Sequence, residues 1–120
     1  MSRSRALIVA AIVVVFLIVG GVLIYANTQK GGQNITFNLT VTGGKSMTSD
    51  HPLQAHQNDN ITINVKSDQD GEVHLHTYDI AFDAKAGETV NHTFKADKTC
   101  TCLIEWESTS TELGNLVVSP

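Results

Sequence analysis

The sequence predicts an all-β protein, a β-sandwich of about seven to eight strands, preceded by one apolar helix. Three observations support this fold class. The first 25 of the 120 residues contain a long uncharged apolar run. After residue 33, apolar and polar residues alternate with a period of two. Turn residues rich in Gly, Asn and Asp separate these alternating segments at intervals of about 8–12 residues, as in β-sandwiches.

Composition limits the function classes. The formal net charge is −4 and no basic stripe occurs, which argues against a nucleic-acid partner. Two cysteines are too few for a disulfide framework. The sequence contains no serine–histidine–acid order and no glycine-rich phosphate loop, so we expect no enzyme. Roughly 85 residues remain after the apolar run, which is enough for one small domain.

The apolar run from Ala6 to Tyr25 has no charged residue. A helix of 20 residues spans about 30 Å, the thickness of a bilayer's hydrocarbon core. Arg3 and Arg5 precede the run, and the positive-inside rule keeps them in the cytoplasm. We therefore predict a cytoplasmic N-terminus (1–5), a transmembrane helix (6–25), a linker (26–33) and a domain (34–120). The domain would lie on the periplasmic or extracellular side of the cytoplasmic membrane, held by this single-pass anchor.

A cleaved signal peptide is the alternative for this run. Signal peptides have an apolar region of about 7–15 residues that ends in a small-x-small cleavage site. This run is longer, and the segment 24–26 is a poor cleavage site because Tyr25 lies in its middle. No cysteine follows directly, which argues against a bacterial lipoprotein. An uncleaved anchor is favoured.

The remaining chain divides into short strands and turns. The clearest alternation runs from Ile35 to Val41, where apolar residues take every second place. Further strands are expected at 53–56, 61–65, about 71–82 as one strand, 89–94, 102–107 and 113–118, with a loop at 43–50. Four Asn-x-Thr triplets begin at Asn34, Asn38, Asn60 and Asn91. They are either glycosylation acceptors or the water-facing phase of strands, and the second interpretation is favoured.

Two of the five histidines, His74 and His76, lie one residue apart in the segment 71–82. In a strand, residues i and i+2 share a face, so both imidazoles point to the same side. Two converging imidazoles provide half of a metal site. The alternative is a pair of solvent-facing histidines on an alternating strand.

The segments 57–65, 70–79, 86–89, 94–98 and 113–120 together resemble the cupredoxin-like domains that are membrane-anchored or secreted. The piece with the pattern E-V-H-x-H-x-Y-D, at 72–79, is the most specific, and the resemblance covers about residues 34–120. It implies a Greek-key β-sandwich and kinship with copper proteins. It also implies that a histidine near the position of His74 is a metal ligand. Thr77 stands where the family pattern usually has glycine.

The chain departs from the family after Trp106. The following segment, 107–114, contains no Cys, His or Met, so the usual blue-copper ligands are missing, and Glu107 stands where many relatives have histidine. Cys100 and Cys102 instead lie near the start of a predicted strand. If this strand runs antiparallel beside the histidine strand, the two pairs lie at similar heights. Two imidazoles and two thiolates suit Cu(I) or Zn(II).

The predicted metal ligands are therefore His74, His76, Cys100 and Cys102. Copper, as Cu(I) or Cu(II), is the predicted metal, with zinc as a second candidate. Two alternatives remain open for the cysteines: a reducible disulfide, or packing of Cys102 in the core. Other candidate ligands are weaker: Glu107, Met47 and His51. His56 and His92 are expected to face solvent.

The predicted function is copper carriage or delivery, or electron transfer, for a membrane complex such as an oxidase. Delivery is favoured because the usual ligand loop of electron-transfer relatives is absent. The alternative is a metal-free accessory or structural subunit that docks through its sandwich face and its helix. In that case Gly20 and Gly21 would provide a close-packing position for another helix.

Overall fold

The computed structural model describes residues 32–120. The predicted membrane helix (6–25) and most of the predicted linker (26–33) lie outside the described residues. Within residues 32–120, no helix is long and apolar enough to cross a membrane.

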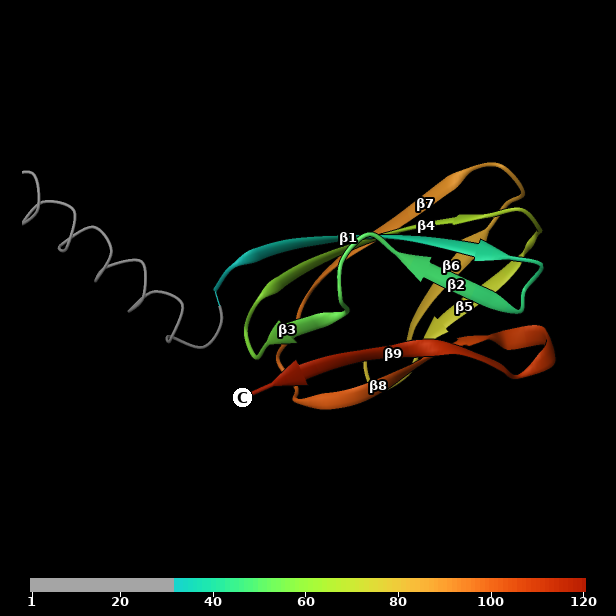
Figure 1. Ribbon diagram of the computed structural model, residues 1–120. Helices are drawn as coiled ribbons and strands as arrows, with labels where there is room; N and C mark the ends of the chain where they lie inside the picture. The colour runs from blue at the N-terminus through green and yellow to red at the C-terminus, as the bar shows by residue number, and fades with distance from the viewer. Residues whose placement is uncertain (1–31) are drawn as a thin grey trace, which may run out of the picture.

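The described residues form nine strands and one short 3₁₀ turn, arranged in two sheets (Figure 1). One sheet has the order β2-β1-β4-β7 and the other has the order β3-β9-β8-β5-β6. The elements are β1 (Asn34–Thr42), β2 (Ser46–Ser49), β3 (Gln54–His56), β4 (Asn60–Ser67), β5 (Gly71–Leu75), β6 (Ile80–Ala84), β7 (Thr89–Lys95), β8 (Cys100–Trp106), η1 (Glu107–Thr109) and β9 (Thr111–Ser119). The predicted all-β sandwich is confirmed for this part of the chain, which has nine strands where about seven to eight were predicted.

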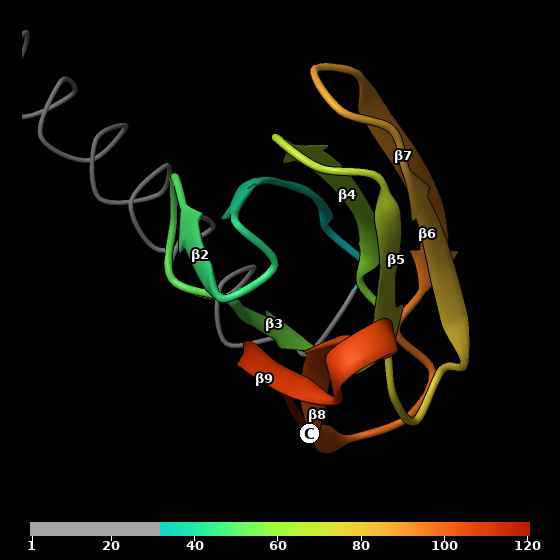
Figure 2. The same ribbon diagram turned by 90° about the vertical axis from the view of Figure 1, so that its right-hand side faces the viewer.

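The core lies between the two sheets and follows from the alternation in the sequence. Phe37, Leu39 and Val41 of β1 are buried, while the residues between them face water. The same alternation buries Ile61, Ile63 and Val65 of β4 against the other sheet's inner residues, such as Val73, Leu75, Ile104 and Leu116. Seen along the sandwich, β6 and β7 lie side by side, so edge strands of the two sheets meet there (Figure 2).

Two segments differ from the predicted strands. The predicted loop at 43–50 contains β2, which pairs antiparallel with β1 and places Ser46 opposite Thr42. The predicted single strand at 71–82 is a hairpin of β5 and β6 with a turn at 76–79. Thr77 and Asp79 have positive φ values of 74° and 53°, which end the extended conformation. Single-sequence alternation missed this turn because Thr77 is a poor residue for positive φ.

Trp106 ends β8 and is almost completely buried. The backbones of Gly44 and Gly71 lie against its indole: a Cβ at Gly44 would lie 2.6 Å from Nε1, and one at Gly71 would lie 2.2 Å from Cζ2. Both positions therefore require glycine for close packing. This packing fixes the end of β8 and, with it, the position of Glu107, the next residue.

Candidate metal centre

The pairing of β5 with β8 determines where His74 points. The two strands run antiparallel, with Val73 opposite Trp106, His74 opposite Glu105 and Leu75 opposite Ile104. Val73, Leu75, Ile104 and Trp106 are buried in the core, so the residues between them face outward. His74 and Glu105 therefore lie on the outer face of the five-stranded sheet.

The two ring nitrogens of His74 have different surroundings. Nε2 lies 2.7 Å from Oδ1 of Asp79, a hydrogen-bond distance. Nδ1 is buried, has no hydrogen-bond partner and lies 3.5 Å from Oε2 of Glu107. If Nε2–H donates to Asp79, the lone pair of Nδ1 faces a carboxylate oxygen. Two acceptors facing each other are stabilised when a proton or a cation lies between them.

His76 is the first residue of the turn, and its backbone N–H donates to the carbonyl of Leu103 at 2.9 Å. This bond ties the turn to β8. The His76 imidazole lies beside that of His74, with ring centroids 4.4 Å apart, and its Nε2 is 3.4 Å from Oε1 of Glu105. The predicted convergence of the two imidazoles is therefore present, although only His74 lies within a strand.

Glu107 completes a group of three side chains. One ligand atom from each of His74, His76 and Glu107 lies within 4.8 Å of the other two. Two imidazole nitrogens and one carboxylate oxygen are a common donor set for Zn(II), Cu(II) and non-haem Fe(II). The carboxylates of Asp79 and Glu105 approach the two imidazoles and can orient them, as partners of metal-binding histidines commonly do.

The turn that carries His76 is held from a second side. The hydroxyl of Tyr78 donates to the carbonyl of Lys98 and accepts the Lys98 N–H at 3.1 Å. Burial raises the pKa of the Tyr78 hydroxyl, which keeps it protonated as a donor. Thr77, between these anchored residues, has a φ of 74°, a conformation that glycine adopts without strain. A β-branched residue at positive φ is a strained feature of the kind found near functional sites.

The structure does not bring Cys100 and Cys102 to the histidines. Strands β5 and β8 do pair antiparallel, as the four-ligand site requires. However, the side chain of Cys102 lies on the same face of β8 as those of Ile104 and Trp106, and it is completely buried in the core. A shift of one residue changes the face of a strand, so Cys102 points away from His74. The two cysteines are joined in a disulfide, with their Cα atoms 5.2 Å apart.

Most of the weaker candidate ligands also lie away from the histidine pair. Of them, Glu107 alone joins the histidine pair. Met47 lies on β2 with its Cε near Gly114. His51 is exposed and pairs with Asp50 at 3.2 Å, where hydrogen bonds from Asn38 lower the pKa of Asp50 to about 2. His56 and His92 are exposed, as predicted.

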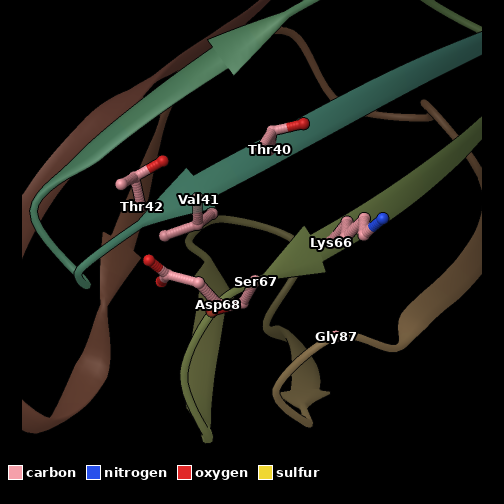
Figure 3. Close-up of a pocket in the computed structure, with 7 residues that line it drawn as sticks. All are labelled: Thr40, Val41, Thr42, Lys66, Ser67, Asp68 and Gly87. Atoms are coloured by element: carbon pink, nitrogen blue, oxygen red, sulfur yellow. The ribbon is translucent and has the colours of Figure 1, made fainter.

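A hollow of about 180 Å³ lies at the four-stranded sheet, near the ends of β1 and β4 (Figure 3). Its lining includes Val41, Ser67, Asp68 and Gly87, and it contains no histidine or cysteine. The hollow is therefore separate from the histidine pair.

Asp79 and Glu105 were missed as partners of the histidines. Asp79 belongs to the motif at 72–79, so its spacing of five residues from His74 was visible in the sequence. Glu105 was not visible, because only the register of β5 against β8 places it opposite His74.

Comparison with known proteins shows the fold but no family. No protein-family model matches the chain, and no curated protein matches it. A chain of a heme-copper terminal oxidase dimer matches with a TM-score of 0.55 and 13% identity, over 98% of this chain and 100% of that chain. The multicopper oxidase mgLAC matches with a TM-score of 0.47 and 14% identity, over 73% of this chain and 39% of that chain.

At these identities the likeness concerns the fold alone. The first match and the two-sheet arrangement agree in fold, a β-sandwich, for the described residues.

Proposed function

We propose that this chain is a membrane-anchored, extracytoplasmic cupredoxin-like protein that binds copper through His74, His76 and Glu107. The observation that carries this proposal is the buried, unpartnered Nδ1 of His74, which faces Glu107 beside a second imidazole. A buried polar atom without a partner costs free energy, and a bound cation would remove that cost.

Copper in the Cu(II) state suits this donor set best. Imidazole and carboxylate are good ligands for Cu(II) and Zn(II), and the Irving–Williams order gives Cu(II) the higher affinity. Cu(I) prefers soft thiolates, and both cysteines of the chain are joined in the disulfide. Bound copper would supply a redox-active or transferable ion on the outer face of the sheet, and the chain itself would catalyse no reaction.

The membrane part of the proposal rests on the sequence. The uncharged run from Ala6 to Tyr25, preceded by Arg3 and Arg5, predicts a helix that spans the cytoplasmic membrane with the domain outside. The similarity to a chain of a heme-copper terminal oxidase supports an oxidase or another membrane complex as the partner.

Carriage is the favoured role, and electron transfer is the second. Two imidazoles and a carboxylate stabilise Cu(II) more than Cu(I), so reduction should weaken binding and release the ion. The full-length protein in detergent would be loaded with one equivalent of Cu(II). The bound copper would then be reduced with ascorbate in the presence of a Cu(I)-specific chelator. Rapid transfer to the chelator supports carriage. Retention through repeated reduction and oxidation supports electron transfer.

A metal-free accessory subunit is the alternative, and one observation favours it. Nε2 of His74 already lies at hydrogen-bond distance, 2.7 Å, from Oδ1 of Asp79, so the ring is held in place without metal. Failure of the full-length protein to take up stoichiometric Cu(II) or Zn(II) would favour this alternative.

A further inference from the structure

The four Asn-x-Thr triplets of the sequence gather on one surface. Asn34, Asn38, Asn60 and Asn91 are all exposed, and all belong to the sheet β2-β1-β4-β7. Each is in the outward phase of its strand, since residues such as Phe37 and Ile61 are buried in the opposite phase. The candidate metal centre lies on the outer face of the other sheet. We call the surface with the four triplets the asparagine face.

We propose that the asparagine face carries N-linked sugar, with Asn91 as the principal site. This rests on the part of the proposed function that places the domain outside the cytoplasmic membrane, where such modification takes place. Asn-x-Thr is the acceptor pattern, and in a strand the Asn and the Thr two residues later point to the same side. Asn91 and Thr93 are both exposed on β7.

Asn91 is favoured by its place in the sheet. β7 is an edge strand and pairs with β4 on one side only in the four-stranded sheet. Among residues 32–120, no side-chain hydrogen bond engages the Asn91 amide. In contrast, Asn38 donates its amide to Asp50 at 2.7 Å and accepts from Asn64 at 2.9 Å, so its amide is held.

The register limits how many sugars the face can hold. Asn34 and Asn60 lie directly opposite each other on β1 and β4, and the Asn60 amide donates to Asn34 Oδ1 at 3.2 Å. Neighbouring strands lie about 4.8 Å apart, which is too close for two sugar chains side by side. We therefore expect sugar on Asn34 or on Asn60 in a given molecule, but not on both.

The chemical step is a transfer from a lipid-diphosphate-linked oligosaccharide by a membrane glycosyltransferase. The amide nitrogen of Asn91 forms a bond to the anomeric carbon, and the bond from that carbon to the phosphate oxygen breaks. The lipid diphosphate leaves, and one amide proton passes to a base. The side-chain amide of Asn91 keeps its second N–H as a donor, and the backbone hydrogen bonds of β7 are not involved.

Peptide mapping by mass spectrometry of the full-length protein, isolated from the membranes of the cell that makes it, tests the proposal. We expect a sugar mass on the Asn91 peptide and none on Asn64 or Asn115, which lack Thr at the second following position. Thr93→Ala should abolish the modification at Asn91, and Thr93→Ser should retain it. The intact mass should show at most one sugar for the pair Asn34 and Asn60.

An unmodified Asn91 would overturn the assignment, and four unmodified asparagines would overturn the whole proposal. Equal occupancy of Asn64 or Asn115 would also contradict it, because the acceptor pattern would then have no role. Copper titration of the same protein separates the two proposals. Sugar-free protein that binds copper leaves the metal centre intact, whereas glycosylated protein that binds no metal contradicts the metal centre alone.

Discussion

Nδ1 of His74 lies 3.5 Å from a carboxylate oxygen of Glu107, while Nε2 of the same ring lies 2.7 Å from Asp79. One imidazole is thus held between two carboxylates, one from the turn after β5 and one from the end of β8. The first carboxylate can orient the ring and the second can share a cation with it. This relationship defines the candidate metal centre.

Glu107→Gln should lower the affinity for Cu(II) by about 10–100-fold, because an amide oxygen is a weaker ligand than a carboxylate. The fold should be unchanged, since the Glu107 side chain is about half exposed. Isothermal titration of the full-length protein measures the change. Glu88→Gln, at an exposed position in the turn before β7, is the matched control and should leave the affinity unchanged.

Replacement of both cysteines by alanine tests the ligands that the sequence suggested. Cys102 is buried on the core side of β8, so we expect the Cu(II) affinity to stay within about twofold of the parent protein. Thermal stability should fall, because a disulfide and buried sulfur contacts are lost. A tenfold or greater loss of affinity, in a variant whose circular dichroism shows that it still folds, would indicate that the cysteines are metal ligands.

Gly71→Ala should destabilise the domain by about 1–3 kcal/mol, because the new Cβ would lie 2.2 Å from the buried Trp106 ring. Gly114→Ala is the matched control. Its Cβ would meet only the flexible end of Met47, at 2.9 Å, and should cost less. Denaturant unfolding of both variants measures the difference. Equal stability of the two variants would show that close packing of Trp106 against the Gly71 backbone does not contribute to stability.

Thr77→Gly should stabilise the domain by roughly 0.5–1 kcal/mol. A side chain with a Cβ is strained at a φ of 74°, and glycine removes the strain at some cost in unfolded-state entropy. Thr77→Ala keeps the Cβ and should gain less. Unfolding curves for the two variants decide the question, and a loss of stability in the glycine variant would show that Thr77 is not strained.

Much of the fold was readable from the sequence because the apolar residues of β1, β4 and β8 alternate regularly, and burial of one face imposes that pattern. The turn at 76–79 was not readable, because Thr77 and Tyr78 favour strands and give no local signal of positive φ. The antiparallel adjacency of β5 and β8, which was the condition for a site of two histidines and two cysteines, is present. The face of β8 on which Cys102 lies was not readable, because a shift of one residue in the strand register exchanges the two faces. That register is fixed by core residues such as Val73 and Trp106, which lie opposite each other.

The most direct test is a Cu(II) titration of the full-length protein in detergent, followed by electron paramagnetic resonance. We predict one saturable site with a dissociation constant of about 1 μM or tighter and with nitrogen coupling from two imidazoles. His74→Gln with His76→Gln should abolish this site, whereas His56→Gln with His92→Gln, which removes two exposed histidines elsewhere, should retain it. Unchanged copper binding after loss of His74 and His76, or no binding tighter than micromolar in the parent protein, would contradict the proposed metal centre.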